Sequence, residues 1–420
     1  MSSPVTLAVL GAGARGTGYA KYAEKYPDLL KIVAVADPID LRRNTMGDAY
    51  DIPEDKRFIS WEDFVKEPKM CDGVIISTQD ALHEAPAIAC AKLGYHILLE
   101  KPMATTADAC RRIVAAVKAS GVMMAVCHVL RYTKYTAGVK KVLSDGEIGD
   151  IMTIQHLEPL GYWHQAHSFV RGNWRNEAES SPMLLAKSCH DVDWLRGIVG
   201  KKCSRIHSFG TVRHFHKAEQ PAGAADRCTD CPDKIESFCP YSAKKIYFRD
   251  RLCKGATYWP TNVLTPNPTP DSLDEALKTG PYGRCVYCCD NDVVDNQVVN
   301  MIFEDGSTCQ MLMTGFNFHG SRNTRIFGSK GELEVDGRYI KVRHFLDDSE
   351  RVIDTETLND GGILTGHGGG DFGLMKCFVK ALANNDPSYI LSGVDETLES
   401  HLMVFAAEES RKTNTVVEIK

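Results

Sequence analysis

The feature that most constrains this chain is a glycine-rich turn directly after a short apolar run near the amino terminus. The run Val5–Leu10 leads into Gly11-Ala12-Gly13-Ala14-Arg15-Gly16, and a helical pattern continues to Tyr26. A short apolar run is typical of a parallel strand buried on both faces. The glycines permit a tight turn and let backbone N–H groups and the helix dipole approach a pyrophosphate. This order of strand, turn and helix predicts a dinucleotide-binding unit.

Further apolar runs alternate with helical patterns as far as residue 128. The runs are Ile32–Ala36, Gly73–Ser77, Tyr95–Leu99 and Val122–Cys127, and Ala107–Ala119 is one of the helical stretches. This alternation predicts a doubly wound parallel sheet, and therefore an α/β Rossmann domain over residues 1–128.

Beyond about residue 150 the pattern changes to strands, several of them joined by hairpin-type turns. The expected strands are Ile151–Glu158, Arg205–His214, Asn296–Phe303, Ser307–Thr314, Thr324–Gly328 and Leu333–Asp336. Helical patterns cover Asp191–Val199, Asp371–Ala383 and Val394–Arg411. We expect residues 129–420 to form an α+β domain with a largely antiparallel sheet. The Pro-rich passage Pro260–Pro270 is expected to be an ordered loop inside it.

Composition excludes some classes of function. The chain has 420 residues and a net charge of -6, which argues against nucleic acid or an anionic membrane surface as the main partner. No apolar run is long enough to cross a membrane. The amino terminus lacks the basic segment of a signal peptide. We therefore expect a cytoplasmic protein.

An acidic residue follows the second apolar run. Asp37 stands about 20 residues beyond the glycine turn, where a carboxylate accepts hydrogen bonds from the adenosine ribose of NAD. Arg42 and Arg43 lie close behind it and would suit the 2′-phosphate of NADP. We favour NAD over NADP. The alternative is a chance glycine turn with Asp37 as an ordinary loop acid.

Glu100-Lys101-Pro102 follows another strand of the expected sheet, at the carboxyl edge where ligands bind. A lysine there can point at a substrate beside the nicotinamide. Without further context, a solvent-facing lysine at a strand end would be the simpler interpretation.

Taken together, these motifs resemble the Gfo/Idh/MocA oxidoreductase family, which includes glucose–fructose oxidoreductase and inositol dehydrogenase. The resemblance implies that Lys101 lies at the active centre, that the bond before Pro102 is often cis, and that the C-terminal sheet mediates a homo-oligomer, a dimer or tetramer. The implied cofactor contacts are Gly11, Gly13, Ala14, Arg15, Gly16, Asp37, Ser77, Thr78, His83, Glu100 and Lys101.

A second hallmark of the family is an apolar stretch that leads to a histidine, with an aspartate three residues later. Here it runs from Met183 to Asp193, and His190 falls on the family's catalytic histidine. Inositol-dehydrogenase-like members carry an acid four residues before that histidine, but this chain has Ala186 there, followed by Lys187. On a continuous helix, Lys187 and His190 would share a face.

Oxidation of a sugar hydroxyl requires a base with a pKa near the working pH. Imidazole meets this requirement without tuning, so we expect His190 to be the base and Lys101 to orient and polarise the oxygen. The reverse assignment stays open. Lys187 is a third catalytic candidate.

Two further segments, Gly161–Arg175 and Gly366–Asp371, are candidates for substrate binding. Aromatic faces stack on pyranose rings, and Arg and His donate to hydroxyls. A packed, hydrogen-bonded loop is the alternative for the first segment, and a helix cap is the alternative for Asp371. A metal at the H-x-x-H spacing of the first segment is only weakly indicated. The candidates are Trp163, His164, His167, Arg171, Trp174, Arg175, His367 and Asp371.

Seven of the fifteen cysteines lie between Cys228 and Cys289, within an insertion at about residues 215–292. Two C-x-x-C knuckles at such a separation have the spacing of a structural zinc site. We expect zinc on Cys228, Cys231, Cys239 and Cys285, with Cys288 and Cys289 also in range. Free thiols, a redox disulfide or an iron–sulfur cluster are the alternatives.

Three functions compete. The first is an NAD-dependent oxidoreductase that transfers a hydride between a sugar-like or cyclitol-like hydroxyl and the nicotinamide. The second is an NAD-dependent glycoside hydrolase that works by transient oxidation and elimination. The third is a non-catalytic NAD-binding regulatory protein, against which the intact Glu100-Lys101-Pro102 and His190 argue.

Overall fold

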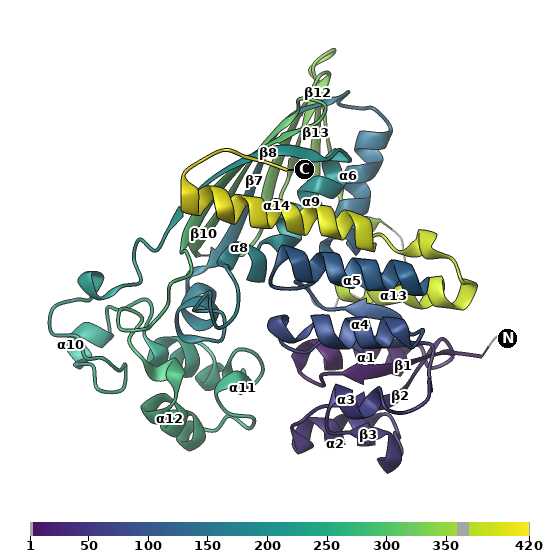
Figure 1. Ribbon diagram of the computed structural model, residues 1–420. Coiled ribbons are helices and arrows are strands. Elements are labelled where there is room, and N and C mark those ends of the chain that lie inside the picture. The colour runs from purple at the N-terminus through teal and green to yellow at the C-terminus, as the bar shows by residue number, and fades with distance from the viewer. Residues whose placement is uncertain (1–2, 319, 359–368, 420) are drawn as a thin grey trace.

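The computed structural model describes residues 3–318, 320–358 and 369–419, which build two sheets with helices around them (Figure 1). The N-terminal sheet has six parallel strands in the order β3-β2-β1-β4-β5-β6. This is the strand order of a dinucleotide-binding sheet, with its switch point beside β1. The strands are β1 Val5–Leu10, β2 Leu30–Ala36, β3 Arg57–Phe58, β4 Gly73–Ile76, β5 His96–Leu99 and β6 Met124–Val126.

Helices connect these strands as βαβ units. They are α1 Ala14–Lys25, α2 Asp40–Ala49, α3 Trp61–Phe64, α4 Glu84–Lys92 and α5 Ala107–Ser120, with short 3₁₀ segments η1 Glu54–Lys56, η2 Asp80–Leu82 and η3 Val129–Tyr132. The sequence specifies the ends of α5 clearly. The hydroxyl of Thr106 accepts from Ala109 N, and Gly121 ends the helix at a φ of 65°.

The second sheet has nine strands in the order β14-β13-β12-β11-β7-β10-β9-β8-β15. Its central strand β7 pairs parallel with β10, and the other pairs are antiparallel. The expected largely antiparallel sheet is therefore confirmed. The strands are β7 Ile151–Gly161, β8 Cys203–Thr211, β9 Asn296–Phe303, β10 Thr308–Asn317, β11 Asn323–Gly328, β12 Gly331–Val335, β13 Tyr339–His344, β14 Glu350–Asp354 and β15 Val417–Glu418.

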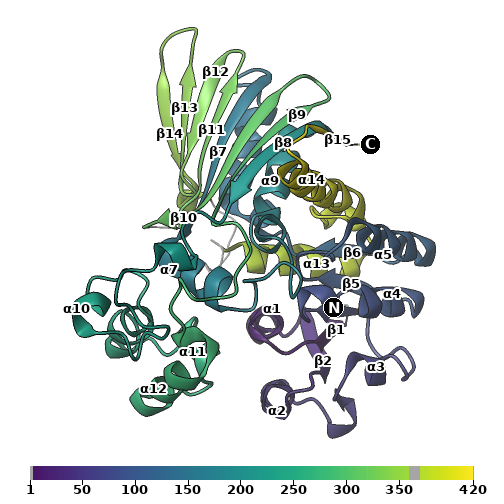
Figure 2. The ribbon, with the colours of Figure 1, turned by 60° about the vertical axis from the view of Figure 1, so that its left-hand side comes forward.

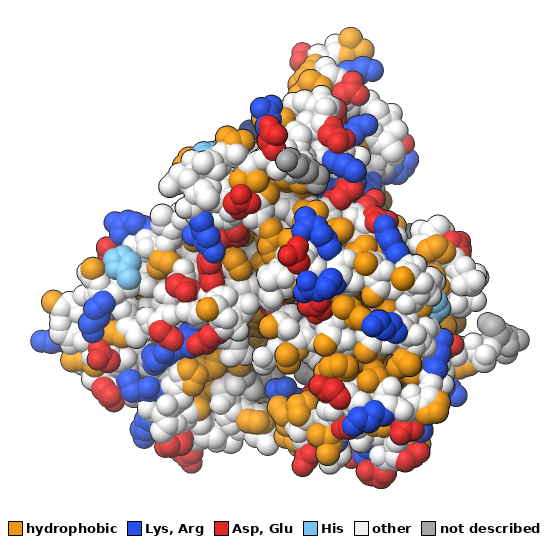
Figure 3. Space-filling model, viewed as in Figure 1, with side chains coloured by type: hydrophobic (Ala, Val, Ile, Leu, Met, Phe, Trp, Pro, Cys, Tyr) orange, Lys and Arg blue, Asp and Glu red, His pale blue; other side chains and the backbone are white. Residues whose placement is uncertain are grey.

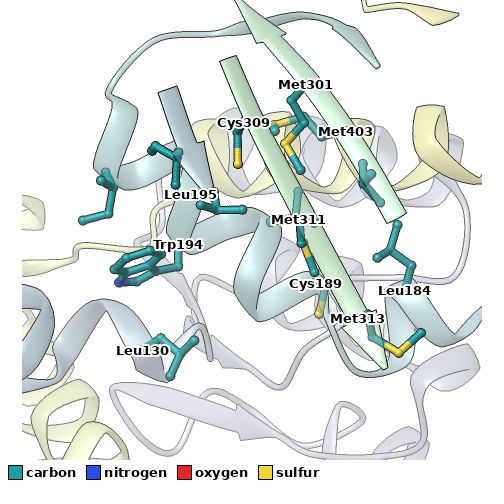
Figure 4. Packing of buried hydrophobic residues seen from close by; sticks show 14 of the residues in the cluster. Leu130, Leu184, Cys189, Trp194, Leu195, Met301, Cys309, Met311, Met313 and Met403 are labelled. Atoms are coloured by element: carbon teal, nitrogen blue, oxygen red, sulfur yellow. The ribbon is translucent and has the colours of Figure 1, made fainter. Parts of the chain in front are cut away.

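Helices cover one face of this sheet, and no helix of the described residues covers the other, here called the open face (Figure 2). The helices that pack there are α6 Lys134–Ser144, α9 Cys189–Val199 and α14 Val394–Thr413. Alternate side chains of β9 and β10 point into the core beneath them, among them Met301, Met311 and Met313 (Figure 4). The fully buried Trp194 of α9 closes one side of this core, and its indole N–H donates to Thr136 at 2.9 Å.

One helix from late in the chain returns to the Rossmann domain. α13 Gly370–Asn384 packs against α1, β1 and η3, and its residues Leu374, Met375 and Phe378 belong to the same buried cluster as Leu7 and Val9 of β1. The two parts of the chain are thus joined by packing as well as by the connection near residue 128.

The insertion stands apart from both sheets and carries short helices (Figure 1). Two expectations are corrected here. The passage Pro260–Pro270 is not a plain loop, because it contains a turn of helix and the start of α12. The segment from Trp163 to Arg175 is largely helical. The elements of the insertion are η5 Lys217–Glu219, α10 Asp233–Glu236, the π-helix η6 Lys244–Arg249, η7 Leu252–Lys254, α11 Thr261–Leu264, α12 Pro270–Thr279 and η8 Pro281–Gly283. The chain before the insertion carries α7 Tyr162–His164, the π-helix η4 Gln165–Arg171 and α8 Met183–Ala186.

The surface is mixed in charge. Acidic and basic side chains are interspersed over the face shown in Figure 3. Among the described residues, no helix has the length and apolarity needed to cross a membrane. The remaining described elements are two short 3₁₀ segments, η9 Thr355–Thr357 and η11 Pro387–Tyr389.

Burial along β10 alternates, and this alternation gives a test of the fold. Met311 is fully buried, whereas its neighbour Leu312 points to the open face and is 37% exposed. We expect Met311→Ala to lower the free energy of unfolding by about 2–5 kcal/mol, because it leaves a cavity in the core. Leu312→Ala should cost well under 1 kcal/mol. Urea denaturation followed by circular dichroism measures both, and equal losses would contradict the register of β10.

Candidate active site

The glycine turn between β1 and α1 is tightly packed against the start of the next loop. Gly11 has a φ of +98°, and a Cβ there would lie 2.6 Å from the carbonyl oxygen of Ser77. A Cβ on Gly16 would lie 2.2 Å from the carbonyl oxygen of Gly11. Ser77 Oγ donates to that same oxygen at 2.7 Å. The turn therefore tolerates only glycine at these two positions.

Gly13 differs from its two neighbours, because a Cβ there would meet nothing within 4 Å. Its side faces open space at the start of α1, whose first N–H groups have no side-chain cap. Free N–H groups and a helix N-terminus at the carboxyl edge of a parallel sheet suit a pyrophosphate. The residues present thus fit the dinucleotide that the sequence predicts.

Asp37 lies at the end of β2, beside this turn. Its carboxylate accepts from Ala12 N and from Ile39 N, both at 2.8 Å. Arg43 donates to the carbonyl oxygen of Asp37 at 2.7 Å and pairs with Asp40. These contacts occupy Arg43, so it is poorly placed to hold a 2′-phosphate.

A buried carboxylate connects the glycine turn to the Glu-Lys-Pro segment. Glu100 is 5% exposed, pairs with Arg15, and accepts from Tyr19 OH at 2.9 Å and from Lys101 N at 2.5 Å. Burial alone would raise the pKa of Glu100, but the charge of Arg15 holds it below its usual value. Arg15 also pairs with Asp371 at 2.8 Å. The structure thus gives Asp371, a substrate candidate, an ionic contact with the cofactor turn.

Lys101 reaches across to the second domain. Its Nζ donates to the carbonyl oxygen of Ala186 at 2.6 Å. A backbone oxygen thus serves as the acceptor at the position where the family resemblance implies an acid in inositol-dehydrogenase-like members. The Lys101–Pro102 bond is cis, as the family resemblance implies. His83 is fully buried and lies 2.8 Å from Pro102 O and 3.2 Å from Thr78 O, so it joins the loops after β4 and β5.

His190 stands in the first turn of α9 and is 6% exposed. Behind it lies His128, a fully buried imidazole whose ring centroid is 5.6 Å away. Burial lowers the pKa of His128 to about 3, so this neighbour is neutral. Asp193, three residues after His190, forms an ion pair with Arg131, whose Nε lies 2.6 Å from Asp193 Oδ2. Lys101 and His190 belong to opposite domains, and Lys101 contacts the segment that leads to His190, at Ala186. Their catalytic roles stay predictions.

One expectation about Lys187 is wrong. The helix does not run continuously from Met183 to Asp193, because α8 ends at Ala186 and α9 begins at Cys189. Lys187 lies in the break, with φ -113° and ψ -59°, and its ammonium lies 2.8 Å from Glu158 of β7. The ammonium of Lys187 thus serves, together with Arg322, as a cation partner of the buried Glu158.

The predicted substrate residues of the first segment divide into two groups. Three of them anchor the insertion and have little surface left for a ligand. His167 is bonded to Tyr247 OH at 2.7 Å, Arg171 donates to Tyr241 O at 2.8 Å, and Arg175 pairs with Asp290 at 2.8 Å.

The other three are Trp163, His164 and Trp174, and all are partly exposed. Trp174 Nε1 donates to Asp80 of η2 at 3.2 Å, beside the loop that carries Ser77 and Thr78. These side chains remain candidates for substrate contact. The predicted His367 lies outside the described residues.

The prediction of structural zinc is not supported. Cys228, Cys231, Cys239 and Cys285 do line one small pocket. However, within residues 3–318, 320–358 and 369–419, no group of three or more His, Cys, Asp or Glu side chains is arranged to hold a metal ion. Burial raises the pKa of Cys239 and Cys285, which favours protonated thiols. Within the described residues these cysteines form no disulfide, and the alternative of free thiols stays a prediction.

Sequence reasoning missed Glu158 and its neighbour His156. Both are buried and stand two residues apart on β7, on the face that points toward α9. His156 lies 2.9 Å from Asp191, and Arg322 bridges Asp191 and Glu158. The alternation of side chains along β7 could have indicated both residues, because polar residues at buried positions of a strand require partners inside the protein.

Fold and site together define a dinucleotide-binding oxidoreductase, with a glycine turn, an acidic residue after β2 and a lysine at the end of β5. Residues 5–128 match the oxidoreductase family with an NAD-binding Rossmann fold, and residues 140–419 match its C-terminal alpha/beta domain. The chain belongs to the Gfo/Idh/MocA family.

Individual relatives are distant. The 2,7-anhydro-N-acetylneuraminate hydratase of Escherichia coli is 26% identical over 47% of this chain and 50% of its own length. The scyllo-inositol 2-dehydrogenase (NADP(+)) IolW of Bacillus subtilis is 28% identical over 40% of this chain and 47% of its own length. The chain thus spans about half the length of these relatives.

Solved structures cover the whole chain. Levoglucosan dehydrogenase, in complex with NADH, superposes with a TM-score of 0.72 over 100% of both chains at 17% sequence identity. At this level of identity the likeness shows the fold.

The glycine turn supplies a test of cofactor binding. We expect Gly16→Ala to weaken NADH binding at least tenfold, because its Cβ would collide with the backbone of Gly11 and displace the turn. Gly18→Ala is the matched control, because a Cβ there would meet nothing within 4 Å in the same helix. Titration of NADH fluorescence measures both, and equal affinities of the two variants would contradict this account of the turn.

Proposed function

We propose that the protein is an NAD-dependent oxidoreductase that transfers a hydride between a sugar-like or cyclitol-like hydroxyl and the nicotinamide. The observation that carries the proposal is the position of Lys101. It stands at the carboxyl edge of β5 and reaches Ala186 of the second domain, on the chain segment that leads to His190. The inositol dehydrogenase among the relatives acts on a substrate of this kind.

When bound, the nicotinamide accepts or returns the hydride. The protein must handle the proton of the reacting hydroxyl. His190, beside the neutral His128, takes that proton as general base. The ammonium of Lys101 donates to the same oxygen and stabilises the negative charge that develops on it. The reverse assignment of these two roles is the alternative.

NAD is the proposed cofactor, although one relative is named for NADP(+). The position of Asp37 at the end of β2, beside the glycine turn, supports a role in accepting hydrogen bonds from ribose hydroxyls, and its charge would repel a 2′-phosphate. Arg43 is held by Asp37 O and by Asp40. Arg42, the other arginine behind Asp37, is exposed and would be available for NADP.

A second candidate is the glycoside hydrolase that uses transient oxidation and elimination. The absence of an acid at Ala186 and the hydratase among the relatives favour it. Both reactions use the same cofactor and the same Lys101. They differ in net redox change, since elimination regenerates the cofactor. Oxidation alone needs fewer assumptions about the site, and we rank it first.

We also propose a cytoplasmic homo-oligomer, a dimer or tetramer. All fifteen cysteines, each in the described part of the chain, are free thiols, which supports a reducing compartment. The open face of the nine-stranded sheet exposes Met152, Phe209, Leu312, Tyr339 and Val352, an apolar surface suited to contact with a second copy.

The catalytic assignment predicts a loss of turnover without a loss of cofactor. We expect Lys101→Ala and His190→Asn each to lower kcat about 10²–10⁴-fold while NADH still binds. The measurement is NADH absorbance with a panel of sugars and cyclitols. Lys92→Ala, an exposed lysine at the end of α4, should change nothing. Full turnover in a double variant of Lys101 and His190 would exclude this pair.

The cofactor choice has its own test. We expect Asp37→Ser to weaken NAD binding about tenfold, because it removes a hydrogen-bond acceptor and a negative charge. The ratio of the NADP and NAD dissociation constants should fall as well. Asp28→Ser, at an exposed turn before β2, is the control. Dissociation constants for both cofactors decide the matter, and wild-type protein that binds NADP more tightly than NAD would refute the assignment.

A further inference from the structure

The insertion brings an aromatic side chain to the edge of the catalytic region. Trp259 is 39% exposed, and its ring centroid lies 4.9 Å from the imidazole of His164. Burial is the largest cause that lowers the pKa of His164, and the charges of Lys187 and Lys101 are further causes. His164 therefore lies within the electrostatic reach of both lysines. Through His164, the insertion borders the predicted active centre.

Trp259 belongs to a continuous row of rings. Trp174 lies 6.2 Å from Phe169, Phe169 lies 6.1 Å from His164, and His164 contacts Trp259. Trp174, at one end of the row, is 37% exposed and is bonded to Asp80 of the Rossmann domain. The row thus runs from the cofactor loops to the insertion. The indoles of Trp174 and Trp259 are both partly exposed.

Polar donors lie beside this apolar surface. The guanidinium of Arg251 lies 4.0 Å over the ring of Trp163, which in turn lies 5.4 Å from Trp259. Tyr258, next to Trp259, is 71% exposed. Exposed aromatic faces with a neighbouring guanidinium and phenol match the chemistry of a pyranose, which has an apolar C–H face and a rim of hydroxyls.

We propose that Trp259 forms part of a second sugar subsite, so that the substrate is a glycoside of at least two rings. One ring is held at Lys101 and His190, and the next is stacked on Trp259 of the insertion. Because the first ring is the one oxidised, this inference rests on the proposed function. It adds the size of the substrate and a role for the insertion.

The test compares matched sugars in the full-length protein with NAD. The probes are free monosaccharides and the α-linked and β-linked disaccharides built from them. For the best pair, we expect kcat/KM of the disaccharide to exceed that of its monosaccharide at least tenfold. Trp259→Ala should remove most of this advantage and leave kcat/KM for the monosaccharide within twofold. Trp259→Phe, which keeps an aromatic face, should retain part of it.

Phe238→Ala is the control, because this aromatic residue of the same insertion is 87% exposed and lies outside the ring row. Circular dichroism and the Tm verify that each variant is folded. The inference is overturned if kcat/KM for disaccharides does not exceed that for monosaccharides in the wild type. It is also overturned if Trp259→Ala lowers kcat/KM equally for both kinds of substrate.

A binding measurement separates the subsite from the reaction. Disaccharides are titrated into the NADH-bound protein by calorimetry, which requires no turnover. Binding that is lost in Trp259→Ala supports the subsite even if no sugar is oxidised, in which case the proposed function fails alone. Equal binding of mono- and disaccharides would overturn the subsite while oxidation of the monosaccharide upholds the proposed function.

Discussion

The buried carboxylate of Glu100 is the interaction on which the arrangement of the site depends. An ionised group in the interior is costly unless it is paired and hydrogen-bonded. Glu100 meets this condition with Arg15 and Tyr19 of α1 and with the backbone N–H of Lys101. One carboxylate thereby fixes the glycine turn relative to the lysine. Because Arg15 also holds Asp371, the same network reaches α13.

A second buried ionic network performs a comparable task in the C-terminal domain. Glu158 of β7 is bound by Lys187 and Arg322, and Arg322 continues to Asp191. Burial would raise the pKa of Asp191, but Arg322 holds it well below its usual value. Asp191 directly follows His190, so this network fixes the backbone that presents the histidine. A buried ion pair thus stands next to each predicted catalytic residue, at Glu100 beside Lys101 and at Asp191 beside His190.

The fold and the cofactor half of the site could be predicted because their signals are local. A glycine turn, an acid after a strand and a Glu-Lys-Pro segment act through the backbone next to them. The rest depends on contacts distant in sequence. Lys187, in the break after Ala186, pairs with Glu158, which lies 29 residues away in the sequence. The cysteine spacing suggested a metal, but spacing does not specify where the thiols point. Within the described residues no group of three or more potential ligands is arranged to hold one.

The return of α13 to the Rossmann domain has a consequence for biosynthesis. Its side chains Leu374, Met375 and Phe378 complete the core on the β1 side of the sheet. A nascent chain that ends near residue 128 therefore exposes apolar surface that its own sequence does not cover. About 250 more residues must be made before α13 is available, which takes roughly 10–50 s at ordinary rates of synthesis. During that interval the half-covered sheet is exposed to aggregation, so the first domain made is among the last to be finished.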